Sequence, residues 1–379
     1  MSAAKPAFDP SPRAPLAPRG VRSGAALPVV VHVGVHGDVP GGMAQVLAEY
    51  LAWPFEELRV RAMASTLGRG RRWSMWRAGV CALRLPLLRL SGTSNAVVVH
   101  LSSGGSFLRE GALAAIARAC GLPVGIHLHG SVFHRDAERR PRLVRAVLSR
   151  AHVVYVLSDE ARRLVRASLG PGAPVRTVAN GVEVPAEGPV KEPLVLFAGE
   201  VGPRKGVDVL WTAWTAVAAT HPGWRLLVAG PVEPEIAALP LPPATELLGA
   251  LPRAETLGVT ARAAVAVLPS RHEALPMFLL EAMARGCATV GTPVGDVARL
   301  LDGCGALVPV DDADALATTL AGLIDDPAAL AELGAAARER VRERYSAPVL
   351  VRMFEREWGL LLGARGGIAG GRRGARGVG

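Results

Sequence analysis

The sequence predicts an α/β fold made of two doubly wound, Rossmann-like domains, and three observations point to it. Short continuous apolar runs alternate with helix-length amphipathic stretches, as expected for parallel strands covered on both faces. A stretch rich in glycine and proline, residues 181–193, interrupts the pattern like a linker, after which the pattern restarts. The length of 379 residues suits two domains.

The first predicted domain covers residues 28–180. Its apolar runs predict strands at 29–34, 58–63, 96–100, 123–127, 153–157 and 175–178. Helices fit between them at 42–52, 73–90, 106–120, 139–150 and 159–169. This strand–helix alternation favours a parallel sheet.

The second predicted domain covers residues 194–345. Strands are expected at 194–198, 225–229, 245–248, 264–268 and 289–290, and helices at 207–219, 253–262, 277–285, 312–324 and 328–342. A final helix, residues 346–362, is expected to pack back onto the first domain. Because ligands of such folds bind at the carboxyl ends of the strands, we expect a site in a central cleft between the domains.

The two ends of the chain are expected to be disordered. Residues 1–27 have several prolines and no apolar core for a signal peptide, and residues 363–379 are rich in glycine and arginine. No stretch is long enough to span a bilayer without charge. The four cysteines lack CxxC spacing, which predicts reduced thiols rather than disulfides or a zinc site. We therefore expect a cytoplasmic protein.

The composition excludes wholesale disorder, because 50% of the residues are hydrophobic and 20% are charged. The net charge of +10 suggests a polyanionic partner, but only three of the 43 basic residues are lysines, a bias that looks compositional. Residues 1–190 hold 24 basic and 12 acidic residues, against 19 and 21 in the remainder. The basic charge therefore belongs to the first domain and points to an acceptor or a membrane surface. Scattered basic residues without an aromatic-basic motif argue against nucleic acid.

The strongest local signal lies in residues 269–286. Glu273 occupies a loop after a strand, and Pro276 suits the first turn of the following helix. Free N–H groups near Leu275 and Pro276 would bind a phosphate, while Glu281 on that helix would accept hydroxyl hydrogen bonds. A helix with a favourable acid near its N-terminus and a surface Glu explains the residues equally well.

A second signal is the strand-to-helix loop of residues 198–206. Arg204 and Lys205 lie in a glycine-containing turn, where two cations suit a diphosphate. Lysine is rare in this chain, so Lys205 is the more informative of the two. A solvated basic loop is the alternative.

Two weaker signals belong to the first domain. Gly41 and Gly42 follow the first strand and open the first helix, where a ligand can approach the backbone. His127 and His129 share a face if the strand continues, so a metal pair is conceivable, but no third ligand has a fitting spacing. We therefore predict no metal, and a His129 that hydrogen-bonds substrate or is structural.

Residues 69–89 carry six arginines beside Trp73 and Trp76. Arginine and tryptophan on one helix are typical of contact with an anionic membrane. An ordinary amphipathic surface helix is the alternative, and Pro86 argues against a continuous helix.

With these motifs in place, residues 28–350 resemble the retaining glycosyltransferase family 4, or group 1, which has the GT-B fold. The stretch PSRHEALPMFLLEAMARGCATVGTPVG, with Glu273 and Glu281, is similar to the family's donor-site signature. FAGEVGPRKGVDVL, VANGVEV, GGMAQVLAEYL and HLHGS resemble its diphosphate loop, linker, glycine loop and active-site histidine region.

The resemblance implies transfer of a sugar from a nucleotide diphosphate donor to a glycan or lipid-linked acceptor, with retained configuration and no cofactor or obligatory metal. Lys205, helped by Arg204, would neutralise the diphosphate. Glu281 would hold the ribose and Glu273 the transferred hexose. The helix N–H groups near Leu275 and Pro276 would bind phosphate, with Gly42 nearby, and His129 would hydrogen-bond the sugar. Localisation would be cytoplasmic, with a peripheral contact on the inner face of the plasma membrane.

The chain departs from the family pattern at two places. Glu200 stands where an Arg is common, and Gly295-Asp296-Val-Ala-Arg299 replaces Gly-Gly-x-x-Glu. These departures leave open a catalytically weakened, nucleotide-binding partner subunit. A sugar-nucleotide epimerase or a phosphorylase on the same architecture is a further alternative.

Overall fold

The computed structural model describes residues 26–37, 41–67 and 70–364. Most of the predicted leader, the predicted tail after Ala364, and Pro40 lie outside the described residues. The described chain divides into two compact units. The first comprises residues up to 156, 160–178 and the chain from 351 on, and the second comprises 157–159 and 179–350.

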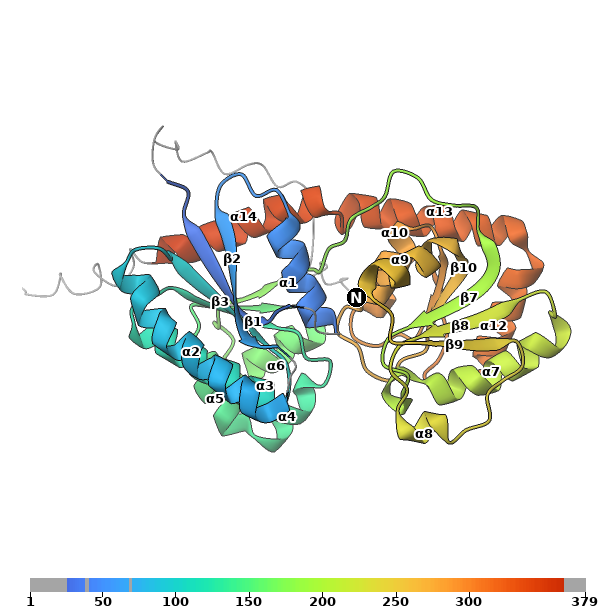
Figure 1. The fold of residues 1–379 in the computed structure, drawn as a ribbon, viewed down its shortest axis with the longest axis horizontal. Helices are drawn as coiled ribbons and strands as arrows, with labels where there is room; N and C mark the ends of the chain where they lie inside the picture. Colours follow the sequence, from blue (N-terminus) through green and yellow to red (C-terminus); the bar gives the residue numbers. More distant parts are fainter. Residues whose placement is uncertain (1–25, 38–40, 68–69, 365–379) are drawn as a thin grey trace, which may run out of the picture. The chain divides into compact units, whose positions relative to one another are not determined.

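The elements of the first unit alternate between strand and helix up to β6, except that two helices, α4 and α5, follow β4 (Figure 1). They are β1 Val29–Val35, α1 Gly42–Ala52, β2 Arg59–Thr66, α2 Gly70–Leu90, β3 Ala96–Leu101, α3 Gly105–Ala119, β4 Val124–Leu128, α4 Phe133–Arg139, α5 Pro141–Leu148, β5 Val153–Val156, α6 Asp159–Leu169, β6 Val175–Thr177 and most of α14 Ala347–Gly363.

The second unit repeats the alternation. Its elements are β7 Glu192–Ala198, the 3₁₀ helix η1 Pro203–Lys205, α7 Val207–Thr220, β8 Arg225–Ala229, α8 Pro234–Ala237, β9 Thr245–Gly249, α9 Arg253–Arg262, β10 Ala263–Leu268, α10 Met277–Ala284, β11 Ala288–Gly291, α11 Val297–Leu301, β12 Ala306–Leu307, α12 Ala313–Asp325 and α13 Pro327–Arg344. The segment predicted as a linker lies in this unit, because the longer stretch of the unit runs from Ala179 to Leu350.

Each unit is built on a parallel sheet, which confirms the predicted fold class. Within the described residues, the strand orders are β2-β1-β3-β4-β5-β6 and β12-β11-β10-β7-β8-β9. The order reverses between β1 and β3 in one sheet and between β7 and β10 in the other. Such switch points separate the loops that follow two neighbouring strands, which makes room for a ligand at that edge.

The strands form because their apolar runs are covered on both faces. All six residues of β3 and of β10 are buried. Two of the predicted helices differ from their expected course, and the short α8, α11 and β12 were not predicted. The helix expected at 139–150 begins at Pro141, because proline lacks an N–H and suits a first helical position, and α4 precedes it. α2 continues through Pro86, next to the fully buried Leu85, so packing compensates for the lost hydrogen bond.

Helix α14 covers one face of the first sheet. Phe354 and Trp358 are fully buried against Tyr50 of α1, with ring centroids 4.8 and 5.5 Å from it. The Glu355 carboxylate accepts hydrogen bonds from the backbone N–H groups of Glu56 and Glu57. Among the helices of the described residues, none combines the length and apolarity that crossing a membrane requires.

Candidate functional site

Lys205 and Glu273, predicted from separate motifs, meet in the second unit. Lys205 ends η1 after β7, and Glu273 lies in the loop after β10. The two strands are neighbours at the switch point, so both loops leave the same edge of the sheet. Lys205 Nζ donates to Glu273 Oε1 at 2.5 Å, and Ser270 Oγ donates to the same oxygen at 2.8 Å. An ammonium group has three N–H donors, so Lys205 retains donors for a second anion.

Gly206 allows these two loops to pack closely. Its φ is +69°, and a Cβ at this position would lie 1.9 Å from the carbonyl oxygen of Pro269. Any side chain would therefore be strained and would clash with backbone. The backbone N–H of Arg271 also donates to the Arg204 carbonyl at 3.0 Å, so the loops are joined on both sides of Lys205.

Arg271 holds the same loops together through its side chain, a role that the sequence did not reveal. Its guanidinium donates to both carboxylate oxygens of Asp208 in the first turn of α7, at 2.8 and 2.7 Å, and pairs with Asp311 at 2.7 Å. The hydrogen bonds from Arg271 lower the pKa of Asp208. One more arginine in an arginine-rich chain carried no signal, although Arg271 lies within the stretch 269–286 and Asp208 lies two residues after the 198–206 loop.

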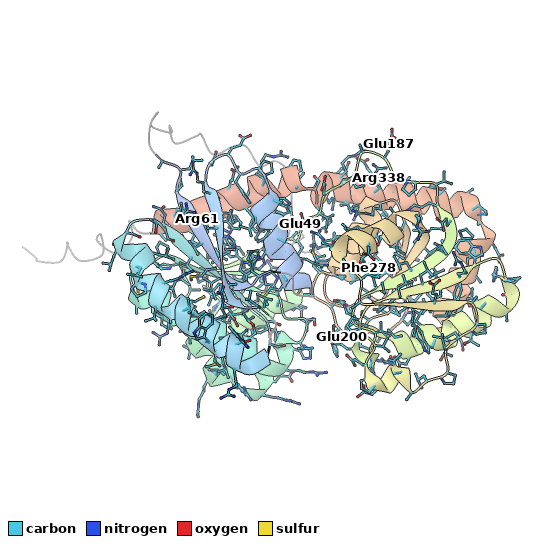
Figure 2. All side chains as sticks on the ribbon, viewed as in Figure 1. Glu49, Arg61, Glu187, Glu200, Phe278 and Arg338 are labelled. Atoms are coloured by element: carbon cyan, nitrogen blue, oxygen red, sulfur yellow. The ribbon has the colours of Figure 1, made fainter. Side chains whose placement is uncertain are left out.

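Arg204 forms an ion pair with Glu200, the residue that stands where the family pattern commonly has an arginine. Arg204 Nη2 donates to Glu200 Oε2 at 2.9 Å, and the two side chains are 34% and 49% exposed. Glu200 lies on the loop after β7 and is labelled in Figure 2. Desolvation and the Glu200 carboxylate raise the pKa of Glu233. The positive charge of Arg204 is thus directed at Glu200, whereas that of Lys205 is directed at Glu273.

Leu275 and Pro276 precede helix α10. Pro276 was expected in the first turn of this helix but lies just before it. Pro276 has an extended backbone and caps a helix that begins at Met277. Asn180 Nδ2 donates to the Leu275 carbonyl at 3.1 Å, which fixes the entry into the helix. Because proline has no N–H, the unpaired N–H groups of the first turn begin at Met277.

Glu281 lies within α10 and is only 4% exposed. Arg253, at the start of α9, donates to Glu281 Oε1 at 3.1 Å. The structure therefore places an arginine beside the carboxylate that was predicted to accept hydroxyl hydrogen bonds. Sequence reasoning did not single out Arg253.

The segment Gly295–Arg299, a turn that leads into α11, supports the backbone of Glu273. Gly295 has φ +57°, and a Cβ there would lie 2.2 Å from the Glu273 carbonyl oxygen. The Asp296 N–H donates to the Ala274 carbonyl at 2.8 Å. Arg299 of α11 pairs with Asp296, the N-cap residue of that helix, and burial raises the pKa of Asp296 against the effect of that arginine. The departure at Arg299 is therefore matched by Asp296 in the same segment.

In the first unit, His129 lies at the end of a row of histidines. His32 on β1, His100 on β3 and His127 on β4 lie on the same face of the sheet, since His100 is paired with His127 and His32 with Val98. His32 Nδ1 and His100 Nε2 are 2.8 Å apart, as are His100 Nδ1 and His129 Nε2. His129 follows the end of β4 and is partly exposed.

Burial keeps these histidines neutral. It lowers the pKa of His32 and of His129 to about 3, and it lowers the pKa of His100 and His127 well below the usual value. Neutral imidazoles bind by hydrogen bonding rather than by charge. His129 can therefore contact a ligand hydroxyl without repelling a cationic centre.

The sequence spacing gave no third metal ligand beside His127 and His129, and the structure supplies one in His100. Ligand atoms of His100, His127 and His129 lie within 4.8 Å of one another, so these residues could hold a metal. His100 Nδ1 and His129 Nε2, however, are at hydrogen-bond distance from each other. A metal between them would have to separate the two nitrogens.

Gly41 and Gly42 lie where the glycine loop was predicted. Gly41 has φ +125° and caps α1, whose first residue is Gly42. A Cβ added at Gly41 would meet no atom within 4 Å. The positive φ, and not crowding, explains why glycine is favoured at position 41.

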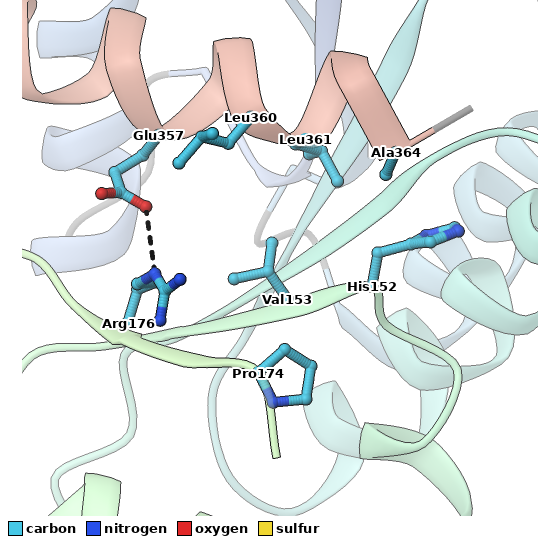
Figure 3. A pocket seen from close by; sticks show the side chains of 8 residues that line it. All are labelled: His152, Val153, Pro174, Arg176, Glu357, Leu360, Leu361 and Ala364. Atoms are coloured by element: carbon cyan, nitrogen blue, oxygen red, sulfur yellow. Dashed lines mark ion pairs between the residues drawn. The ribbon is translucent and has the colours of Figure 1, made fainter. Parts of the chain in front are cut away.

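A hollow elsewhere in the first unit is lined by none of the predicted residues. It lies beside β5, β6 and α14 and is lined by His152, Val153, Pro174, Arg176, Glu357, Leu360, Leu361 and Ala364 (Figure 3). Arg176 Nε lies 3.8 Å from Glu357 Oε2 at one end of it.

Two family models match the chain, one on each unit. Residues 192–326 match "Glycosyl transferases group 1", and residues 19–181 match "Glycosyl transferase 4-like domain". Phosphatidyl-myo-inositol mannosyltransferase of Mycolicibacterium smegmatis is 34% identical over 55% of this chain and 57% of its own length. Glycogen synthase of Mycobacterium tuberculosis is 29% identical over 75% of this chain and 72% of its own. Exopolysaccharide phosphotransferase of Streptomyces coelicolor is 30% identical over 59% of this chain, but only a quarter of that protein is covered.

Solved structures agree on the GT-B fold. Sucrose-phosphate synthase from Thermosynechococcus elongatus superposes with a TM-score of 0.72 at 21% identity, covering 89% of this chain and all of that one. HepE of Anabaena, solved with UDP-glucose, gives a TM-score of 0.69 at 14% identity over 87% of this chain and 99% of that one.

Proposed function

This chain belongs to the glycosyltransferase group 1 family, and from that premise we propose that it transfers a sugar from a nucleotide diphosphate donor with retained configuration and without a metal. The observation that carries the proposal is the Lys205–Glu273 pair at the β7–β10 switch point. Lys205 stabilises the negative charge that develops on the departing diphosphate, as electrostatic catalysis requires. Arg204 and the N–H groups at the start of α10 support it.

The remaining predicted residues hold the donor. Glu273, fixed by Lys205 and Ser270, contacts the transferred hexose, and Glu281 accepts hydrogen bonds from the ribose. Gly42 approaches the phosphates, and neutral His129 hydrogen-bonds the sugar near the reacting carbon. Both carboxylates are already largely buried, so a bound ligand removes little further water from them.

A glycan or a lipid-linked molecule is the proposed acceptor. The names of two relatives, a phosphatidyl-myo-inositol mannosyltransferase and a glycogen synthase, support one class each. We assign the reaction to the synthesis of a cell-surface polysaccharide or glycoconjugate on the cytoplasmic side of the membrane.

The exposed face of α2 supports a peripheral contact with an anionic membrane. Large apolar side chains recur there at helical spacings of three, four and seven, and each is more than half exposed: Trp73, Trp76, Leu83, Leu87 and Leu90. Exposed arginines, Arg72, Arg84 and Arg89, accompany them on the helix. The opposite stripe, with Cys81 and Leu85, is buried against the sheet. Arginine beside an apolar stripe suits anionic lipid.

The catalytic proposal is tested by incubating the chain with a panel of sugar nucleotides and measuring release of nucleoside diphosphate, with and without lipid or glycan acceptors. We expect acceptor-dependent release, and weaker donor binding by Glu281→Ala. Tight nucleotide binding without any release would identify a partner subunit instead. Turnover without an acceptor would indicate an epimerase, and dependence on free phosphate a phosphorylase.

The membrane contact is tested by cosedimentation with vesicles of phosphatidylglycerol or of phosphatidylcholine. We expect the chain to bind the anionic vesicles, and the Trp73→Ala/Trp76→Ala variant to bind at least fivefold more weakly. Leu239→Ala, an exposed apolar residue of the second unit, is the matched control. Equal binding by all three proteins would exclude α2 as the contact.

A further inference from the structure

The histidines of the first unit form a hydrogen-bonded chain that runs from the core to His129. His32 Nδ1 contacts His100 Nε2, and His100 Nδ1 contacts His129 Nε2, both at 2.8 Å. His32 and His100 are fully buried. His100 therefore uses both ring nitrogens within the chain.

The protons in this chain can be arranged in two ways only. A neutral imidazole has one N–H and one lone pair, and burial keeps the three rings neutral by lowering their pKa values. His100 must then donate through one nitrogen and accept through the other. Both hydrogen bonds consequently point in the same direction, either toward His129 or away from it.

The surroundings of His32 decide between the two directions. Among the described residues, His32 Nε2 is buried without a hydrogen-bond partner, and so is the indole N–H of Trp358. The ring centroids of His32 and Trp358 are only 4.6 Å apart. Indole is a donor only, and a buried unpaired N–H is rarer than a buried unpaired acceptor. A lone pair at His32 Nε2 is therefore favoured over a second unpaired N–H.

We propose that His32 and His100 are positioning residues that hold His129 as a neutral hydrogen-bond donor with its proton on Nδ1. His32 Nδ1–H donates to His100, and His100 Nδ1–H donates to His129 Nε2. The inference rests on the proposed function, in which His129 contacts the donor sugar. It deepens that role, because Nδ1–H recognises an oxygen lone pair and not a hydroxyl proton.

His127 provides a matched comparison within the same cluster. Its ring centroid is 4.0 Å from that of His129 and 5.4 Å from that of His100, and it is equally buried. It does not take part in the two hydrogen bonds that define the chain. His127→Phe should therefore disturb packing without changing the tautomer of His129.

The test is nitrogen NMR of the full chain labelled with ¹⁵N-histidine, in which the shifts and long-range couplings of each ring report its tautomer. Signals are assigned with His129→Gln. We expect the Nδ1–H form of His129 in the wild type from pH 6 to 8. A wild type with the proton on Nε2, or with metal-shifted nitrogens, would overturn the proposal without any variant being needed.

Variants then separate positioning from packing. His100→Phe should give His129 a mixture of tautomers and lower kcat for sugar transfer at least tenfold, whereas His127→Phe should keep the Nδ1–H form. An unchanged tautomer in both His100→Phe and His32→Phe would refute the positioning role. If His129→Gln retains full transferase activity, the catalytic assignment of His129 fails, while the NMR result still decides the tautomer.

Discussion

The two units share a parallel-sheet architecture but keep their polar groups in different places. In the first unit, the buried, neutral His32, His100 and His127 lie within the strands, on the face covered by α1 and α14, and the partly exposed His129 directly follows β4. In the second, the buried residues of β7, β8 and β10 are apolar, and the charged groups lie on the loops that follow the strands, held in ion pairs. One unit thus offers uncharged hydrogen bonding, and the other offers charge for an anion.

This difference has a physical reason. A charged group inside a sheet would suffer the full cost of desolvation, so a buried strand carries only side chains that can become neutral. On the loops at the carboxyl edge, Lys205 and Glu273 are also largely buried, but their ion pair offsets part of the cost of desolvation. The comparison predicts that substitutions of charged residues lower activity most in the second unit. It also predicts that a fall in pH lowers stability most in the first unit.

The largest effect is expected from removing the cation of the second unit. Lys205→Ala should lower kcat/KM for transfer about 10²–10³-fold, the range seen when a preorganised donor to a developing anion is lost. Steady-state kinetics on the donor checks this. Lys191→Ala is the matched control, because that lysine contacts the Ala261 carbonyl and Cys287 instead. A loss smaller than fivefold would contradict the assignment.

A change of pH should act on the first unit. Because the folded pKa of His32 is about 3 and the usual value is 6.5, the unfolded chain binds more protons between these values. Stability is then fully present above pH 6.5 and decreases as pH falls toward 3, by up to about 1.4 kcal/mol per pH unit for one such histidine.

Hydrogen exchange resolves this effect by unit. After correction for intrinsic exchange, protection of β1, β3 and β4 should fall about tenfold or more between pH 6.5 and 5. Protection of β7 and β10 should change less. The pKa of Asp208 is lowered, so the stability that its ion pair with Arg271 gives the second unit is lost only at still lower pH. An equal loss of protection in both units would contradict the predicted difference between them.

A smaller effect is expected at Arg271. Arg271→Lys keeps the charge but loses the paired hydrogen bonds to Asp208, so the loops of Lys205 and Glu273 should loosen. We expect the donor KM to rise about three- to tenfold with a modest loss of stability. Arg262→Lys, at a half-exposed pair with Glu192, serves as the control. If both variants behave alike, Arg271 does not position the site.

The sequence by itself determined the fold class and the motif-bearing loops of this protein. Continuous apolar runs predicted the strands because burial on both faces leaves a local pattern, and the rarity of lysine drew attention to Lys205. Patterns of this kind depend on neighbours along the chain. They predicted the start of α10 at Met277 but not that Pro276 would cap it, because a cap depends on backbone conformation.

Only the tertiary structure decided which residues meet. Lys205 and Glu273 are 68 residues apart, and His100 and His129 are 29 apart; each pair forms because their strands are neighbours in a sheet. Strand order is set by packing over the whole unit, not by local periodicity. For that reason Arg271, Arg253 and His100 gave no signal in the sequence, although in the folded chain they contact Asp208, Glu281 and His129.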